Sequence, residues 1–396
     1  MIPQANGFQF QFVSVALAWY FYIDVFNRTL LKSSFPIIYF LSLILIVGAA
    51  LLGPIRLGKG WSFFGLISIW YLFSCIYSLD PANGLEQVIG FSLVSLAVLM
   101  IVGILGKTKV IEQVMKHGFF AGLMYLCFCL VNYDVLFMKG FYGADLFFVG
   151  PEGHRANAGR QLGYIAFFCL WMLIFSEKKT MRAVAALGFF VSIYLIFTTW
   201  TRNPFLLVFL PSMAYLGLKA KKFFLVTIGM GVLTLYGLLF FVDILGVGSY
   251  VEYISNRGTS GRYDLMLHLI NEVTHRGAQL YGLGIGSLDL INKDNYVLLS
   301  RDTFHLVATY HEVGIVGILL WLSLICSSLL MLWINRNALS KSSLFAMCLV
   351  VYGFFNPSEA ILIHFSGLIT FTLYLFIVAS LTPSEQFNAN RRVVAG

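Results

Sequence analysis

Residues 87–105 read QVIGFSLVSLAVLMIVGIL, a stretch without a single charged side chain. About 20 such residues form a helix that crosses the hydrocarbon core of a bilayer. Similar stretches recur along the 396-residue chain, of which 59% is hydrophobic and only 11% is charged. Soluble domains carry roughly 25% charged residues, so too few polar side chains remain to cover a water-facing surface. The composition therefore predicts an integral membrane protein.

Twelve stretches qualify as candidate transmembrane helices. They are 8–26, 35–53, 61–79, 87–105, 118–138, 161–177, 183–200, 203–218, 223–244, 305–334, 343–356 and 358–381. No stretch shows the period-2 alternation of a membrane barrel, and the chain shows no internal repeat. The first stretch is followed by others, so it is interpreted as a span and not as a cleaved signal peptide. The sequence predicts an all-α membrane protein of about 12 transmembrane helices in a single domain, 1–396.

The charges predict the orientation of these helices. With the N-terminus inside, the cytoplasmic side holds fifteen of the 26 Lys and Arg residues but only three of the 18 acids, Glu112, Glu177 and Glu385. Cytoplasmic loops of membrane proteins are enriched in Lys and Arg, so the pattern supports this topology. It also accounts for the net charge of +8 without a nucleic-acid partner. The six cysteines fall within apolar stretches and are interpreted as packing residues.

One connection between the predicted spans is unusually long. Residues 245–304 form a loop between the ninth and tenth spans on the non-cytoplasmic side, and a shorter outer loop covers 139–160. Long loops on a compact membrane body are usually functional or disordered. The stretch 263–275 has the apolar spacing of a helix, which favours function. The glycine-rich segment 281–286 is not preceded by a strand, so a tight turn is the better interpretation than a nucleotide loop.

The outer side is rich in arginine, whereas the inner side is rich in lysine. A planar guanidinium binds phosphate or carboxylate through two parallel hydrogen bonds, which an ammonium cannot do. The alternative, that these arginines pair with the abundant outer acids, stays open for each of them. The candidates for anion binding are Arg155, Arg160, Arg202, Arg262 and Arg301.

Two of these arginines lie in informative contexts. Arg202 precedes Pro204, which suits the first turn of a helix, so Arg202 is placed at the outer mouth of a span. Arg262 follows Ser260, which can cap the helix predicted over 263–275, and helix N-termini favour anions. Snorkelling to the membrane interface is the alternative role for Arg202.

His305 and His311 open the span that follows the long loop, with Asp302 and Glu312 close by. Six residues apart on a helix, the two histidines face different directions, so a shared metal ion is not expected. One of them can act as a general base near neutral pH; a histidine that is hydrogen-bonded at the membrane edge is the alternative. The outer loops contain no Asp-x-Asp pair, so we expect metal-independent chemistry without a cofactor.

The chain resembles the bacterial O-antigen ligase/polymerase superfamily, the lipid-linked polysaccharide polymerases and lipid A–core ligases. The resemblance rests on the twelve spans, the long outer loop, TRNPFL at 201–206, SGR at 260–262 and EVGIVG at 312–317. It implies a GT-C-like glycosyltransferase in the bacterial inner membrane with its active site facing the periplasm. The donor would be a glycan on undecaprenyl diphosphate, and the acceptor a growing glycan or lipid A–core. A chain-length regulator is a further expected partner.

The resemblance also implies residue roles. Arg202 and Arg262 would bind the diphosphate, His305 would activate or orient the acceptor, and the other three arginines would guide the glycan or add to the anion site. Ligases of this family carry a histidine eleven residues before the first glycine of Gly-x-x-Gly, and counting back from Gly314 gives Thr303. This departure favours a polymerase over a ligase. A polytopic transporter or flippase is the leading alternative of another class, although the predicted span centres lack the charges that mark transport pathways.

Overall fold

The computed structural model describes the parts of the chain that form regular elements. These are residues 7–31, 37–53, 60–139, 146–151, 153–199, 201, 204–205, 207–209, 212, 262–288, 305–334, 346, 348–350 and 368–382. Of these described residues 86% are helical, and the strands among them form one short hairpin. The contacts divide the chain into two compact units, 1–121 with 268–396, and 122–267.

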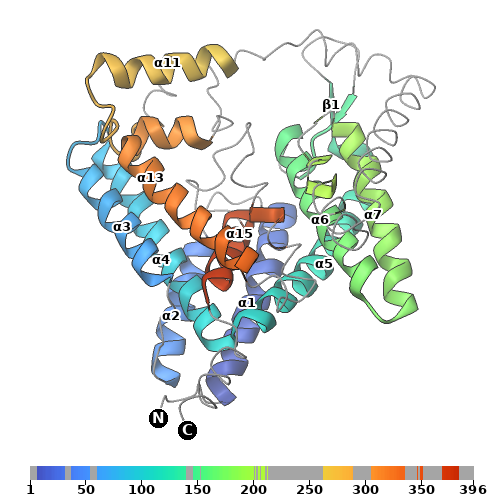
Figure 1. Ribbon diagram of the computed structural model, residues 1–396. Helices are drawn as coiled ribbons and strands as arrows, with labels where there is room; N and C mark the ends of the chain where they lie inside the picture. Colours follow the sequence, from blue (N-terminus) through green and yellow to red (C-terminus); the bar gives the residue numbers. More distant parts are fainter. Residues whose placement is uncertain are drawn as a thin grey trace. The chain divides into compact units, whose positions relative to one another are not determined.

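The helices follow the apolar stretches closely for most of the chain (Figure 1). The described α-helices are α1 (Gly7–Phe26), α2 (Ile37–Leu52), α3 (Trp61–Cys75), α4 (Pro81–Leu105), α5 (Lys107–Val131), α6 (Arg155–Phe175), α7 (Lys179–Thr199), α11 (Arg262–His275), α13 (His305–Ile334) and α15 (Leu368–Leu381). The predicted spans 203–218, 223–244 and 343–356 lie largely outside the described residues.

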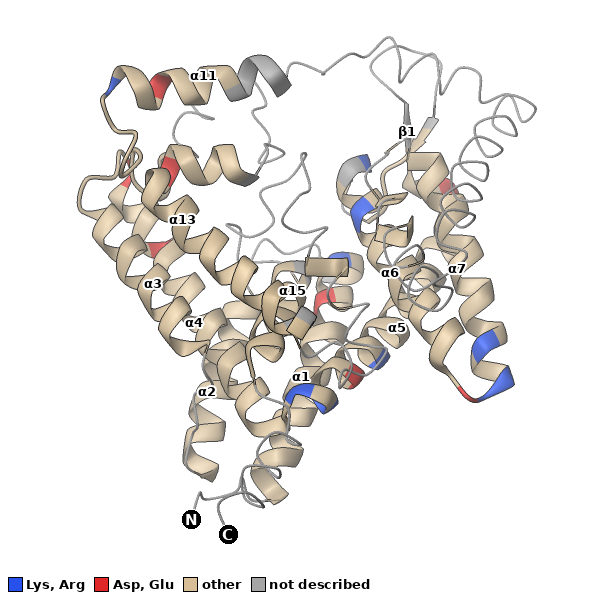
Figure 2. Cartoon of the chain, in the orientation of Figure 1, with Lys and Arg blue, Asp and Glu red and all other residues tan. Residues whose placement is uncertain are grey.

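Five of the described helices are long and apolar enough to cross a membrane. They are Pro81–Leu105, Lys107–Val131, Asn157–Phe175, Lys179–Thr199 and Leu306–Met331. Their charged residues lie mostly toward the helix ends, with apolar stretches between them (Figure 2). The composition and these helices together support a membrane protein, whereas the count of about twelve spans and the GT-C-like arrangement stay predictions.

Helix α4 lies at the centre of the first unit, where α1, α2, α3 and α15 all contact it. It is apolar on every side, and the residues from Ala97 to Val102 are all buried. A helix that is hydrophobic all round must be covered all round. The N-terminus of α4 is capped by the Asp80 side chain, which accepts a hydrogen bond from the Asn83 amide, and Pro81 occupies the first helical position.

Polar side chains inside this unit pair with one another. The Trp321 indole of α13 donates to the Tyr71 hydroxyl of α3 over 2.7 Å, and Tyr20 and Ser42 join α1 to α2 over 2.8 Å. Because lipid tails are as apolar as leucine, such hydrogen bonds and close packing must hold membrane helices together. They fix which faces of these otherwise similar helices meet.

The second unit is built from the end of α5, the antiparallel pair α6 and α7, and a hairpin. Glycine lets the helices approach closely here: a Cβ on Gly122 would lie 2.9 Å from the Ile165 side chain of α6. A Cβ on Gly188 would lie 3.0 Å from the Cys169 sulfur. Small residues at helix contacts are typical of membrane bundles.

Two predicted boundaries were wrong in this region. Helix α5 begins at Lys107 and not at 118, so Glu112 and Lys116 lie within the helix, where they form an exposed ion pair of 2.7 Å. It also ends at Val131, because the following residues form η2 (Tyr133–Leu136) and the strands β1 (Phe137–Lys139) and β2 (Leu146–Phe148). Residues 132–138, expected inside the span 118–138, therefore belong to the connection between α5 and α6. The strands are too short for their alternation to stand out in the sequence.

Candidate functional site

Helix α13 contains a kink at Gly314. This residue has φ 66° and ψ −167°, far from helical values, so the helix consists of a short segment, 305–313, and a longer one, 315–334. A Cβ at this position would clash with the backbone carbonyl of Leu280. Beside the kink, the Trp70 indole of α3 donates to the Val313 carbonyl over 3.1 Å.

The N–H groups released by the kink are taken up by residues of the long outer loop. In a regular helix the amides of Ile315 and Val316 would donate to carbonyls four residues earlier. They donate instead to the carbonyls of Gln279 and Leu280, over 3.0 and 3.2 Å. The segment after the kink therefore starts with its first donors satisfied, as every buried helix end requires.

The released carbonyls are satisfied by the same part of the loop. His311 and Glu312 each accept through their backbone oxygen, from the amides of Leu283 (2.7 Å) and Gly284 (2.9 Å). The buried carboxylate of Glu312 adds a third bond, from the Gly286 amide over 3.0 Å. Residues 278–286, named here the glycine turn, are thus inserted into the kink of α13.

The glycine turn also lies against the connection from α3 to α4. The Tyr77 hydroxyl donates to the Tyr281 carbonyl over 2.6 Å, and the Ser78 hydroxyl donates to the Ile285 carbonyl over 2.7 Å. Gly284 has φ 91°, and a Cβ there would clash with the backbone of Ser78. The tight turn predicted over 281–286 is confirmed, and its glycines are required both by positive φ and by lack of space.

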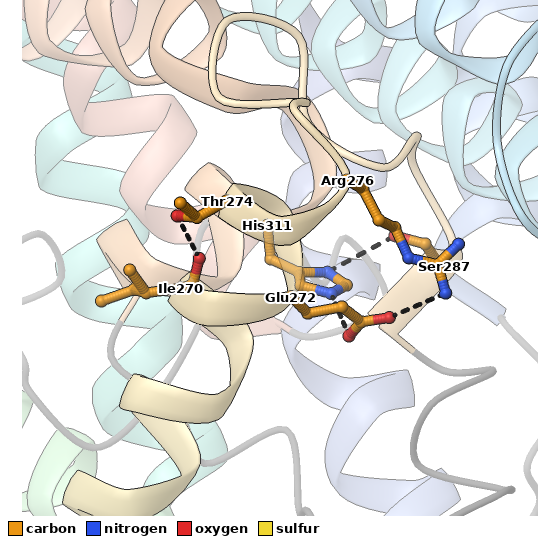
Figure 3. A network of polar contacts seen from close by, with 6 residues as sticks. All are labelled: Ile270, Glu272, Thr274, Arg276, Ser287 and His311. Atoms are coloured by element: carbon orange, nitrogen blue, oxygen red, sulfur yellow. Dashed lines mark hydrogen bonds and ion pairs between the residues drawn. The ribbon is translucent and has the colours of Figure 1, made fainter.

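A chain of polar side chains, buried at its His311 and Ser287 end, links α11 to α13 beside this turn (Figure 3). The two ring nitrogens of His311 face Ser287 and Glu272: Nδ1 lies 3.4 Å from the Ser287 hydroxyl, and Nε2 lies 3.4 Å from Glu272 Oε2. Arg276 Nη2 lies 3.3 Å from Glu272 Oε1. Exposure falls along the chain, from 52% for the Arg276 side chain to 17% for Glu272 and 0% for His311.

This order of serine, histidine and carboxylate is that of a nucleophilic triad, but the surroundings favour a structural role. Ser287 and His311 are both fully buried. Every backbone N–H from Gly282 to Ser287 already has a partner, so the turn offers no donors to a developing oxyanion. The cluster therefore holds α11 against α13.

The charge state of Glu272 depends on this contact. The hydrogen bond with His311 lowers the pKa of the Glu272 carboxyl from its ordinary value, and the charges of His311, Arg276 and His268 act in the same direction against the opposing effect of burial. The helix α11 itself confirms the expected helix over 263–275, and its Val273 packs with Ala278 and Leu283.

A second group of candidate residues lies in the other unit, at the N-terminus of α6. Arg155, the first residue of α6, lies over the Phe147 ring of β2 at 4.8 Å from its centroid. Arg160 donates to Asn157 Oδ1 over 2.9 Å. Two guanidinium groups therefore lie within the first two turns of a helix, where the helix dipole also favours an anion.

Thr201 and Pro204 lie against the same turns of α6. A Cβ on Gly159 would clash with the Thr201 hydroxyl, and one on Gly163 would lie 2.9 Å from Pro204. Thr201 and Thr199 share a hydrogen bond of 2.6 Å. Pro204 is helical, as expected.

The structure describes the other predicted site residues only in part or not at all. Arg262 opens α11 and His305 opens α13, but their side chains are outside the described part of the chain. Arg202 and Arg301 lie outside it altogether. Of the two histidines, the described one is His311, and it is buried. Among the residues that the structure describes, no three His, Cys, Asp or Glu side chains meet in a way that would hold a metal ion.

Sequence patterns missed two members of the buried cluster, Glu272 and Ser287. Glu272 and Ser287 precede His311 by 39 and 24 residues. Spacing in a sequence predicts neighbours only within one helix or strand, so it cannot predict contacts between different elements. In comparisons with known proteins, no family model and no curated protein matches the chain. A function can therefore be proposed only from the geometry of the two clusters, one around His311 and one at the start of α6.

The close packing of the glycine turn predicts how much stability is lost when its glycines are replaced. Gly284→Ala should destabilise the protein more than Gly277→Ala, because both residues have positive φ but only Gly284 is pressed against Ser78. Backbone strain costs on the order of 1–3 kcal/mol at each site, and the clash adds to it only at Gly284. Thermal unfolding of the two variants in detergent measures the difference. Equal losses of stability would contradict the close packing of the turn.

The lowered pKa of Glu272 predicts a dependence on acid. The folded-state pKa lies below the unfolded one, so the stabilisation is complete above the ordinary glutamate pKa and is lost as the pH falls toward the folded value. The melting temperature of the native protein should therefore exceed that of Glu272→Gln near pH 6, and the gap should narrow as the pH falls below the ordinary glutamate pKa. Other carboxylates titrate in both proteins and cancel in the comparison. A gap that does not change with pH would refute the charge-dependent contact.

Proposed function

We propose that this protein is a membrane glycosyltransferase that uses a glycan linked to undecaprenyl diphosphate and acts as a polymerase of O-antigen or a related surface polysaccharide. The observation that carries the proposal is the packing at the start of α6. Arg155 and Arg160 belong to its first two turns, and Thr201 and Pro204, which flank Arg202 in the sequence, pack against Gly159 of the same turns. A diphosphate carries closely spaced negative charges, which suit fixed guanidinium groups at a helix N-terminus.

In the proposed reaction a sugar hydroxyl of the acceptor attacks the anomeric carbon of the donor. The bond from that carbon to the diphosphate oxygen breaks, and the undecaprenyl diphosphate leaves with the electron pair. Charge develops on the leaving group, so Arg202, Arg155 and Arg160 would stabilise the transition state without a metal ion. Arg262 is proposed to add to the anion site, and Arg301 to guide the glycan.

The acceptor proton needs a base near neutral pH, and the proposal assigns this role to His305. His311 is less suited to it, because it is fully buried and both of its ring nitrogens face protein groups. It supports the short segment 305–313 that begins with His305. The proposed location is the inner membrane with the site facing the periplasm, in keeping with the charge distribution.

Arginine variants test the diphosphate site. Arg160→Ala and Arg202→Ala should each lower glycan transfer by roughly 10²- to 10³-fold, the loss expected when one charge-stabilising group is removed. Arg160→Lys should restore little activity if the contact is bidentate. The measurement is chain extension from purified lipid-linked donor in vesicles.

Arg182→Ala provides a matched control within the same unit. Its guanidinium donates to the Ser176 carbonyl at the opposite end of α6, and the side chain is exposed. This variant should retain activity. Full activity of both Arg160→Ala and Arg202→Ala, in protein that is inserted normally, would refute the proposed site.

Deletion of the gene in its host separates the candidate functions. A polymerase mutant should retain lipid A–core with a single repeat and lose the polysaccharide ladder on a gel. Bare lipid A–core, with long chains left on undecaprenyl diphosphate, would show a ligase instead. An unchanged ladder would contradict both O-antigen roles and favour another glycan or a transporter.

A further inference from the structure

The glycine turn belongs to a loop that the sequence places in water, yet most of its backbone groups form hydrogen bonds with the protein. Each N–H from Gly282 to Ser287 donates to a carbonyl, a hydroxyl or a carboxylate. Eight of its nine carbonyls accept, namely those of Ala278, Gln279, Leu280, Tyr281, Leu283, Gly284, Ile285 and Gly286. A loop in water has no need for such extensive pairing, because water supplies the partners. Non-helical backbone at membrane depth does need it, because lipid supplies none.

The kink fixes the level of the turn relative to the bilayer. The longer segment of α13, 315–334, has twenty residues and is thus about 30 Å long, which matches the hydrocarbon core. The kink at Gly314 then lies at the boundary of that core. Because the turn is bonded to the residues on both sides of the kink, it lies at the same boundary.

The side chains at the tip of the turn are apolar and open. Leu280 is 64% exposed and Tyr281 is 42% exposed. Leu280 lies beside Ile315 and the start of the longer segment, which exposes Ile315 and Leu319 by 41% and 58%. The exposed apolar surface of a membrane-spanning helix thus continues onto the turn without a polar break.

Aromatic residues extend this surface onto α3. The rings of Tyr77 and Tyr281 meet edge to face at 5.1 Å, and Phe73 lies next to Tyr77 at 5.8 Å. Ile76 between them is 79% exposed. Tyrosine is enriched at the boundary between lipid and water, where its ring and hydroxyl suit the two environments.

We propose that the glycine turn is a membrane-interface element, with Leu280 and Tyr281 in contact with the acyl chains of phospholipids. By the charge distribution these lipids belong to the outer leaflet. The loop 245–304 is then anchored to the bilayer at its centre, and α11 lies at the level of the lipid headgroups, with its exposed Asn271 turned to water. The inference does not depend on the proposed enzymatic activity.

A photocrosslinking amino acid tests this contact in the full-length protein. p-Benzoylphenylalanine is placed at Leu280, at Leu319 as a lipid-facing reference, and at Asn271 as a water-facing control. The variants are reconstituted in vesicles of phosphatidylethanolamine and phosphatidylglycerol and irradiated. Variants at Leu280 and Leu319 should both gain the mass of one phospholipid, whereas the Asn271 variant should not.

Two results would overturn the inference. One is the absence of a lipid adduct at Leu280 when Leu319 gives one, which would place the turn in water. The other is an adduct with the mass of a dimer, which would show that a second copy of the chain covers the turn. If substitution at Leu280 prevents insertion, the unaltered protein is irradiated with a diazirine-bearing phospholipid. Mass spectrometry should then find adducts within the glycine turn, and their absence there, with adducts on α13, would reject the inference.

Discussion

A kink inside an apolar helix leaves backbone groups without partners, and this requirement organises the better-described unit of the protein. Gly314 breaks α13 next to the buried residues His311, Glu312 and Val313, so the freed backbone groups must find protein partners. The glycine turn provides them through the amides and carbonyls of residues 279–284. Glycines are required on both sides of the contact, because the two backbones approach too closely to leave room for a Cβ.

Once the turn is inserted, the rest of the local arrangement follows. The connection from α3 to α4 closes over the turn through Tyr77 and Ser78. Helix α11 leads directly into the turn and is held to α13 by Glu272, His311 and Ser287. The segment 305–313, which begins with His305, is therefore held in two places. The glycine turn bonds to the carbonyls of His311 and Glu312, and Glu272 of α11 contacts the His311 ring. A rigid support of this kind is what a catalytic side chain needs, since small displacements are costly for positioned groups.

Much of this could be predicted from the sequence, because hydrophobic length is a local property. The helices α1 to α4, α6, α7 and α13, the helix over 263–275 and the turn over 281–286 were all evident from apolar runs and from glycine. The extension of α5 to Lys107 was missed because its first turns carry charges, which a search for apolar runs excludes. The hairpin of β1 and β2 was missed because three-residue strands give too short a pattern.

The sequence by itself indicated that the chain belongs in a membrane and which segments are apolar enough to cross it, and it predicted an arginine-rich outer side. Only the tertiary structure decided that His311 is buried between Ser287 and Glu272, and that Thr201 and Pro204 pack against Gly159 and Gly163 of α6. The hydrophobicity of a segment depends only on the residues within it, so it can be calculated from the sequence alone. Hydrogen bonds and close contacts depend on distances between atoms remote in sequence, and those distances exist only when the helices have packed.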